Sequence, residues 1–251
     1  MGFVEFVKDP EGVATVKINR PKVNALNESL VDELTESFQS ISDDSSIGSV
    51  ILTGEGSFFS FGLDVPEFLG YSKESFTKFL FKFTDLVKYV FLFPKPVVAA
   101  LNGHTIAAGC MLAMACDYRV MVSNKAKISL NEITFGSTVF ASCVEILKFV
   151  VGGKNAERVL YSGTMYTARE ARELGLVDEV VSKEELKKAA MEVAKEFAKK
   201  DTNAFRSIKS LLRERVAEEI GKREKDSIFE FVDIWYSEST RRNLKDIKIY
   251  S

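Results

Sequence analysis

Residues 95–117 restrict the possible folds of this chain more than any other stretch. The apolar run Val97–Leu101 has the composition of a buried strand, and it breaks at Asn102-Gly103. Small residues follow at Ala107-Ala108-Gly109, and apolar residues then continue at helical density to Ala115. The pattern predicts a strand, a tight turn and a buried helix.

The small residues at the start of this helix have two interpretations. Small side chains let a ligand approach the backbone closely, and the first amides of a helix have no acceptor within it. Such amides can stabilise negative charge that develops on a substrate oxygen. Small residues also allow a helix start to pack tightly with no ligand involved. Residues 95–117 alone leave both interpretations open.

A second stretch favours the ligand-binding interpretation. Residues 57–64 read SFFSFGLD and follow the apolar run 50–53. Together the two stretches resemble the paired oxyanion-hole segments of the crotonase superfamily, the enoyl-CoA hydratases and isomerases. The resemblance begins at Asn19-Arg20-Pro21 and residues 24–27, and it extends to the C-terminal helices. It includes residues 167–181, which are close to the family pattern A-x-x-x-G-L-V-D-x-V.

The resemblance implies a fold and an assembly. The expected fold is α/β, a crotonase (ClpP-like) spiral of ββα turns over residues 1–195 with a helical part over residues 196–251. The C-terminal helices are expected to pack on the interface of a homotrimer, or of a dimer of trimers, and to help close the active site. Apolar positions in them fit this role, because they are too many for an exposed tail: Ile208, Leu211, Leu212, Ile228, Phe231, Val232, Trp235 and Tyr236.

Composition excludes several other classes of protein. The 251 residues, 46% of them hydrophobic, can form one core with an appendage. The formal net charge is −2 and the basic residues are scattered, so neither a nucleic acid nor a membrane surface is an expected partner. Cys110, Cys116 and Cys143 lack metal-ligand spacing, and they are expected to be reduced, buried thiols of an intracellular protein. No signal peptide or membrane span is expected, which indicates the cytoplasm, or the mitochondrial matrix if a presequence has been removed.

Local patterns predict the remaining elements. Residues 3–8 and 13–18 alternate as the strands of a hairpin, and Asn27 is a suitable N-cap for the helix that follows. Gly152-Gly153 is expected to stop a helix that begins near Phe140, with another beginning at Ala156. A capped helix is predicted from Thr167 to Gly175. Helical periodicity continues from residue 183 to the end, with interruptions expected at Asn203, Gly221 and Ser239.

A phenylalanine-rich segment, residues 68–93, has two interpretations. The simpler is a helix buried on a broad face or against a partner subunit. The other is that some of its rings line an apolar acyl pocket, where the resemblance places this segment. The phenylalanines concerned are Phe68, Phe76, Phe79, Phe81, Phe83, Phe91 and Phe93.

Matching to the family motifs assigns the catalytic groups. Removing a weakly acidic α-proton from a thioester needs a positioned base and donors for the enolate oxygen. The resemblance assigns the donors to the backbone amides of Leu63 and Ala108. The family's hydratases use two glutamates. The first position matches Met111, which cannot transfer a proton, and the second matches Glu132.

A single carboxylate suits the movement of a double bond better than hydration. Hydration divides two proton transfers between two carboxylates, whereas isomerisation moves one proton between two carbons. Residues 116–120, 130–132 and 223–231 also resemble the mitochondrial-type Δ3,Δ2-enoyl-CoA isomerases. The peroxisomal-type isomerases carry their base at a position that matches Phe140, so that arrangement is excluded.

The resulting hypothesis is an isomerase that converts a 3-enoyl-CoA into a trans-2-enoyl-CoA in fatty-acid β-oxidation. Glu132 would remove the C2 proton and return it to C4, and apolar neighbours such as Met111 and Phe140 are expected to raise its pKa. CoA would be part of the substrate, with no separate cofactor and no metal. The predicted substrate-binding residues are Phe61, Gly62, Asp64, Gly109, Met111 and Phe140.

Other interpretations of these residues and of the chain stay open. Position alone would make Glu132 a surface residue after a strand, Asp64 a helix cap, and His104 a packing or hydrogen-bonding residue. The chain could carry another crotonase activity, such as hydratase or thioesterase. It could also be a non-catalytic family member that binds acyl-CoA or RNA.

Overall fold

The computed structural model describes residues 2–247 and 249 and contains two sheets. The larger has six strands in the order β1-β2-β3-β5-β7-β10, and β1 and β2 form the predicted antiparallel hairpin. All other neighbours in this sheet are parallel. Its strands are β1 (Val4–Lys8), β2 (Val13–Ile18), β3 (Ser49–Gly54), β5 (Val97–Leu101), β7 (Tyr118–Val122) and β10 (Glu179–Val181).

The smaller sheet has four short strands. Their order is β4-β6-β8-β9, with β9 antiparallel to β8 and the other neighbours parallel. These strands continue from the ends of the larger sheet and position the loops that carry the candidate site. They are β4 (Phe58–Ser60), β6 (His104–Ile106), β8 (Lys127–Ser129) and β9 (Tyr166–Thr167).

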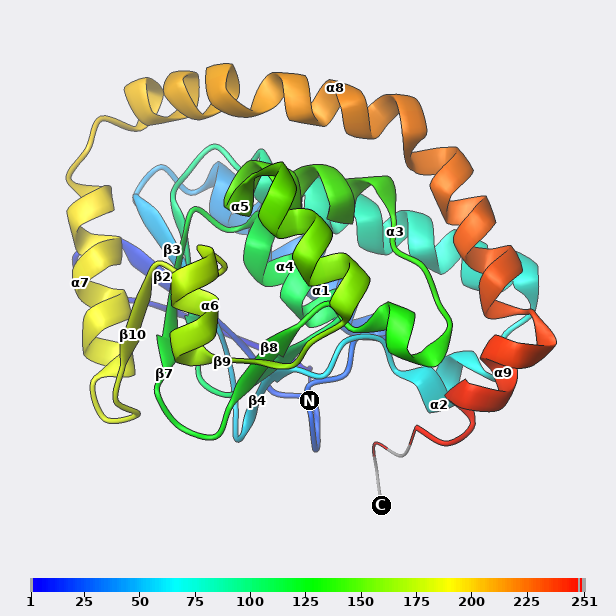
Figure 1. Ribbon diagram of the computed structural model, residues 1–251. Coiled ribbons are helices and arrows are strands. Elements are labelled where there is room, and N and C mark those ends of the chain that lie inside the picture. The colour runs from blue at the N-terminus through cyan, green and yellow to red at the C-terminus, as the bar shows by residue number, and fades with distance from the viewer. Residues whose placement is uncertain (1, 248, 250–251) are drawn as a thin grey trace.

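Three turns of a ββα spiral build this arrangement (Figure 1). Each turn adds one strand to the larger sheet, one to the smaller sheet, and then a helix: β3, β4 and α3; β5, β6 and α4; β7, β8 and α5. The helices of these turns are α2 (Val65–Phe68), α3 (Lys73–Phe91), α4 (Ala108–Ala115), the 3-10 helix η1 (Glu132–Phe135) and α5 (Ala141–Ser162). The predicted spiral is therefore present.

The helix ends that depend on local residues agree with the sequence. In α1 (Glu28–Asp43) the Asn27 side chain accepts from the Leu30 amide, as expected of an N-cap. Thr167 and Glu170 form a capping box at α6 (Ala168–Leu174), and Gly175 ends that helix in the left-handed conformation. Gly152, with φ 76° and ψ 159°, interrupts α5 where the stop was predicted, although helical backbone resumes and continues to Ser162.

The predicted interruptions in the C-terminal part are wrong. α8 (Thr202–Trp235) runs through Asn203 and Gly221, and Ser239 lies inside α9 (Glu238–Leu244). The breaks instead precede Asp201 and Ser237, whose side chains cap α8 and α9. Gly221 stands in open space, so the helix continues there at a cost of only about 1 kcal/mol. The predicted boundary at residue 195 lies within the last turn of α7 (Leu186–Ala198).

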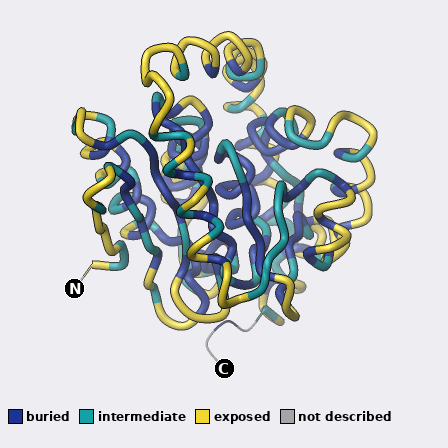
Figure 2. The backbone as a smooth tube through the Cα atoms, turned by 90° about the vertical axis from the view of Figure 1, so that its left-hand side faces the viewer, coloured by how far each residue is buried: buried dark blue, intermediate teal, exposed yellow. Residues whose placement is uncertain are grey.

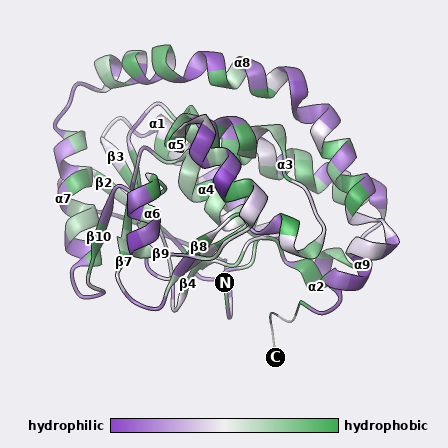
Figure 3. Ribbon diagram, in the orientation of Figure 1, coloured by the Kyte–Doolittle hydropathy of each residue, from purple (hydrophilic) through white to green (hydrophobic). Residues whose placement is uncertain are grey.

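Helix α8 arches over the body of the molecule, from α7 to α9 (Figure 1). Its second half packs on α5 and α3 through pairs such as Ser142–Glu224 and Phe76–Phe231, whereas the outer side of its first half is exposed, as Figure 2 shows. Figure 3 shows hydrophobic and hydrophilic residues alternating along it, and Ile208, Leu211 and Leu212 are 59–75% exposed. Among the described residues, none of the helices has the length and apolar character needed to cross a bilayer.

Candidate active site

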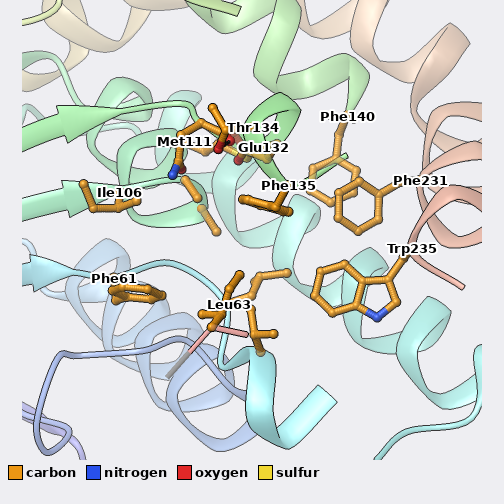
Figure 4. Close-up of a pocket in the computed structure, with 15 residues that line it drawn as sticks. Phe61, Leu63, Ile106, Met111, Glu132, Thr134, Phe135, Phe140, Phe231 and Trp235 are labelled. Atoms are coloured by element: carbon orange, nitrogen blue, oxygen red, sulfur yellow. Dashed lines mark hydrogen bonds between the residues drawn. The ribbon is translucent and has the colours of Figure 1, made fainter. Parts of the chain in front are cut away.

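An apolar cavity of about 290 Å³ lies where the two motif segments, residues 57–64 and 95–117, approach α8 (Figure 4). Apolar side chains dominate its wall. They come from the loop after β4, from β6 and α4, from η1 and from α8. The lining residues are Phe61, Leu63, Val65, Ile106, Ala107, Ala108, Met111, Asn131, Glu132, Thr134, Phe135, Phe140, Phe231, Trp235 and Ile247.

Two glycines let the two motif segments, residues 57–64 and 95–117, touch. A Cβ added at Gly62 would lie 3.1 Å from the Ala107 Cβ and 3.2 Å from the Ala108 nitrogen. A Cβ added at Gly109 would lie 2.7 Å from the Ser60 Cβ, closer than real Cβ contacts allow. Gly62 also has φ +103°, which favours glycine. The segments predicted separately from residues 57–64 and 95–117 therefore form one surface.

The backbone amides of Leu63 and Ala108 both belong to this surface, and they differ from their neighbours. The Gly62 amide donates to Ser60 Oγ at 3.1 Å, and the Ala107 amide donates to the Ser129 carbonyl at 2.8 Å. Neither Leu63 N–H nor Ala108 N–H has an acceptor among the described residues. Ala107 has φ 49° and ψ −121°, a conformation that L-residues rarely adopt and that places Ala108 at the first turn of α4.

Glu132 opens η1 directly beside the cavity. Its side chain is buried, with the residue only 5% exposed, and its Oε2 has no hydrogen-bonding partner among the described residues. Burial disfavours the charged form and raises the pKa of Glu132 to about 8. This agrees with the expected direction, and a carboxyl with such a pKa can both accept and donate a proton near neutral pH.

Aromatic rings close the end of the cavity away from the amides. Phe231 and Trp235 of α8 line it together with Phe140, and Figure 4 shows these rings grouped opposite Phe61 and Ile106. Phe231 and Phe140 lie 4.5 Å apart, centroid to centroid. The C-terminal helices thus help close the cavity of their own chain.

The phenylalanine-rich helix α3 supports these rings from behind. Phe76 lies 4.7 Å from Trp235 and Phe83 lies 6.4 Å from Phe140, again between centroids. None of the described α3 residues lines the cavity. The simpler of the two interpretations, a helix buried on a broad face, is therefore the one that fits.

The predicted site residues divide into two groups. Six of them line the cavity: Phe61, Leu63, Ala108, Met111, Glu132 and Phe140. Gly62 and Gly109 lie just behind the wall and set the approach of the two segments. Asp64 is buried away from the cavity, where it caps α2 through the Glu67 amide at 3.2 Å and pairs with Arg20 at 2.7 Å. The catalytic or substrate-binding role of all nine residues stays a prediction.

The lone histidine and the cysteines lie in structural positions. His104 Nδ1 accepts from the Lys127 amide at 3.2 Å, and its ring lies 5.0 Å from that of Phe58. Cys110, Cys116 and Cys143 are free and buried, and burial raises the pKa of each thiol. His104 therefore packs and forms a hydrogen bond as expected, and the cysteines are the free, buried thiols that were predicted.

Several lining residues were not predicted from the sequence. Ile106 precedes Ala107, whereas Asn131, Thr134 and Phe135 lie within three residues of Glu132, and Thr134 Oγ1 donates to the Asn131 carbonyl at 2.7 Å. Their positions beside Ala107 and Glu132 could have indicated them. Ile247 arrives from the C-terminal end, and no local pattern predicts that contact.

A buried ionic cluster fixes α8 to the body of the molecule. Asp117 accepts from Lys209 Nζ at 2.7 Å and from Arg213 Nη2 at 2.9 Å, and it also accepts from the Val97 amide. Arg213 donates further to the carbonyls of Phe91 and Ala115, at the ends of α3 and α4. This cluster holds the helix that carries Phe231 and Trp235.

The spiral fold thus carries an apolar cavity with a buried carboxyl group and two backbone amides without acceptors among the described residues, and comparison with known proteins gives the family. The chain belongs to the enoyl-CoA hydratase/isomerase family, whose model matches residues 8–240. It is 32% identical over 237 residues to "Enoyl-CoA delta isomerase 1, mitochondrial" of Mus musculus, covering 94% of this chain and 82% of that protein. It is also 32% identical over 214 residues to "Crotonyl-CoA hydratase" of Syntrophomonas wolfei, covering 84% and 82%.

The fold comparison agrees. The crystal structure of human mitochondrial delta3-delta2-enoyl-CoA isomerase superposes with a TM-score of 0.93 at 28% identity, covering 97% of this chain and 95% of that one. The predicted membership of the crotonase superfamily and its fold are confirmed. Isomerases and hydratases both occur among the relatives.

Proposed function

We propose that the protein is an isomerase that converts a 3-enoyl-CoA into the trans-2-enoyl-CoA. One observation carries the proposal. Among the described residues that line the apolar cavity, called the first cavity below, Glu132 is the only carboxylate, and the uncharged Met111 of α4 lies on its wall. One carboxyl can move a proton between two carbons. It cannot by itself divide the two proton transfers of hydration in the way the family's hydratases do.

The proposed mechanism uses Glu132 twice. Its carboxylate accepts the C2 proton, and the electron pair released moves into the thioester carbonyl to give a dienolate. The amides of Leu63 and Ala108 donate to the enolate oxygen, and each such donor is typically worth about 10²–10³ in rate. The protonated carboxyl then returns its proton to C4, and the double bond forms between C2 and C3. The proton count is unchanged over the cycle.

Turnover of a trans-3-enoyl-CoA by the wild type and by Glu132→Gln tests the mechanism. A general acid–base group contributes about 10²–10⁴ in rate, so a loss of that size is expected. Glu157→Gln is the matched control, because Glu157 is an exposed glutamate on α5 outside the first cavity, and its turnover should be unchanged. Full activity in Glu132→Gln would refute the assignment of the base.

Hydration is the second candidate function, because hydratases are among the relatives at the same identity. Adding water to a trans-2-enoyl-CoA would be measured separately from isomerisation. The proposal expects isomerisation to dominate. Fast hydration by the wild type would favour the hydratase and would mean that a group other than a second carboxylate handles the water.

The proposal extends to the substrate, the assembly and the setting. CoA would enter as part of the thioester, with no separate cofactor or metal, and the reaction would serve fatty-acid β-oxidation in the cytoplasm or the mitochondrial matrix. The exposed apolar residues Ile208, Leu211 and Leu212 of α8 support burial of this face in a homotrimer or a dimer of trimers. Light scattering of the purified protein would give a monomer mass if this assembly is wrong.

A further inference from the structure

A second cavity, of about 430 Å³, shares one wall with the first. Of the residues that the structure describes, only Glu132 lines both cavities. The rest of the second cavity is built by η1, by the loop after it and by α5. Its lining residues are Leu130, Glu132, Ile133, Ser137, Thr138, Val139, Val144, Lys148, Gly153, Ala156, Glu157, Leu160 and Tyr161.

Two buried polar atoms belong to residues on this wall, and neither has a partner among the described residues. They are Glu132 Oε2 and Ser137 Oγ, and the two residues are only 5% and 7% exposed. The Ser137 amide donates to the Glu132 carbonyl at 3.0 Å, so the turn after η1 brings the two residues together. Buried polar groups are nearly always hydrogen-bonded, often through ordered water, and the cavity has room for several water molecules.

The second cavity is also the better route from Glu132 to solvent. The first is lined mainly by apolar and aromatic side chains. The second is bordered by Lys148, Glu157 and Tyr161, which are all exposed at the surface of α5. Bulk water can therefore reach the second cavity past polar side chains without crossing the first cavity.

We propose that Ser137 holds a water molecule against the carboxyl group of Glu132 in the second cavity, and that this water exchanges the proton of Glu132 with solvent. The carboxyl gives its proton to the water oxygen while a proton of the same water moves to the other carboxyl oxygen. The carboxyl stays neutral and no net charge moves. Ser137 is a positioning residue in this proposal, since it acts through the water.

The exchange during turnover rests on the proposed isomerase function, and it is tested in heavy water. A proton that Glu132 takes from C2 can be replaced by a deuteron before it is returned to C4. The measured quantity is deuterium at C4 of the product early in the reaction. Ser137→Ala should lower this incorporation about fivefold, the effect expected for one hydrogen bond, while turnover stays near that of the wild type.

Thr138→Val is the matched control, because it removes a hydroxyl from the lining of the same cavity and keeps the shape of the side chain. It should incorporate deuterium as the wild type does. Equal incorporation in the wild type and Ser137→Ala would overturn the proposal. So would an equal fall in both variants, because the effect would not then depend on Ser137.

A second measurement needs no substrate and separates this proposal from the function. Below pH 8 the protonated carboxyl of Glu132 gives an infrared C=O band, identified by its loss in Glu132→Gln. A hydrogen bond from the water lowers its frequency, so the band should shift upward in Ser137→Ala and stay in place in Thr138→Val. An unshifted band in Ser137→Ala refutes the water site. A shifted band in a protein that isomerises nothing supports the water site and refutes the isomerase.

Discussion

Two carboxylates with little solvent exposure, near opposite ends of α4, have opposite surroundings. Asp117, after the C-terminal end, has both oxygens in ion pairs with Lys209 and Arg213 and accepts a backbone amide as well. Glu132, in the cavity beside the N-terminal end, has a buried oxygen without a partner among the described residues. A paired buried charge holds elements together, whereas an unpaired one has its pKa raised and becomes able to transfer protons.

The comparison also concerns stability. Removing one member of a buried ion pair leaves the other charge uncompensated, which is strongly destabilising. An unpaired carboxyl in apolar surroundings is itself a source of instability whenever it is ionised. Substituting each carboxyl with its amide should therefore have opposite effects on the free energy of unfolding, and this contrast can be tested directly.

The largest expected effect on stability is that of Asp117→Asn. The substitution leaves Lys209 and Arg213 buried without a counter-charge, and we expect a loss of about 3–5 kcal/mol in the free energy of unfolding. Burial already lowers the pKa of Lys209 to about 8, so this amine can relieve part of the cost by losing its proton. Arg213 cannot, because its guanidinium stays charged.

Urea denaturation near pH 7 measures this loss, with Asp226→Asn as the control. Asp226 is exposed on α8, so the same chemical change there should alter stability by less than about 0.5 kcal/mol. If Asp117→Asn were as stable as the wild type, the cluster would not be what fixes α8. The two buried carboxylates would then not differ in the way described.

Glu132→Gln should change the free energy of unfolding by less than Asp117→Asn does and in the opposite direction. The size of this change should depend on pH. The pKa of Glu132 is about 8 in the folded protein and near its ordinary 4.5 when unfolded, so the folded state binds more protons between these values. Proton binding by Glu132 therefore gives the folded wild type a stabilisation that is complete below pH 4.5 and is lost as pH rises through 8. The full shift corresponds to at most about 5 kcal/mol, and relaxation around the ionised group should reduce this to roughly 2–3 kcal/mol.

The measurement is the difference in unfolding free energy between Glu132→Gln and the wild type, at pH 5 and at pH 9. The variant should gain relative stability with rising pH. The titratable neighbours that contact this region, the thiols of Cys110 and Cys143, have pKa values raised by burial and stay neutral over this range. Glu214→Gln, at an exposed position of α8, should show no such trend. A parallel pH dependence in all three proteins would mean that the pKa of Glu132 is not raised in the folded protein.

The sequence predicted the surroundings of only one of the two carboxylates, Glu132. Asn27 and Thr167 could be predicted as caps because the groups they bond lie within three residues. The positions of Glu132 and of the amides of Leu63 and Ala108 could be predicted because they follow from matching the spacing of the family motifs. Lys209 and Arg213 lie in a highly charged helical segment, and such residues are normally exposed, so nothing local indicates that they reach Asp117.

The part of the site that could not be predicted depends on distant contacts. Phe231 and Trp235 were expected to be buried, but their place on the cavity wall follows from the arch of α8 over the body. Ser137 has no sequence pattern that separates it from any other loop serine. Helix ends and motif amides are local or fixed by spacing, whereas cavity walls form where segments far apart in the chain meet.

The smallest expected effect, and the most informative about chemistry, concerns Met111. Met111 is 2% exposed and lines the cavity on α4. The motif resemblance matches it to the first of the two glutamates expected in a hydratase of this family. Met111→Glu should therefore raise the ratio of hydration to isomerisation, by roughly tenfold, since only one of several requirements for hydration is restored. Met111→Gln has a similar shape without a titratable proton and should leave the ratio unchanged. If both variants raise the ratio equally, polarity and not proton transfer decides whether water enters. If neither does, the difference between the two reactions lies outside the pair of carboxylates, and the uncharged wall at Met111 does not support the isomerisation that we propose for this cavity.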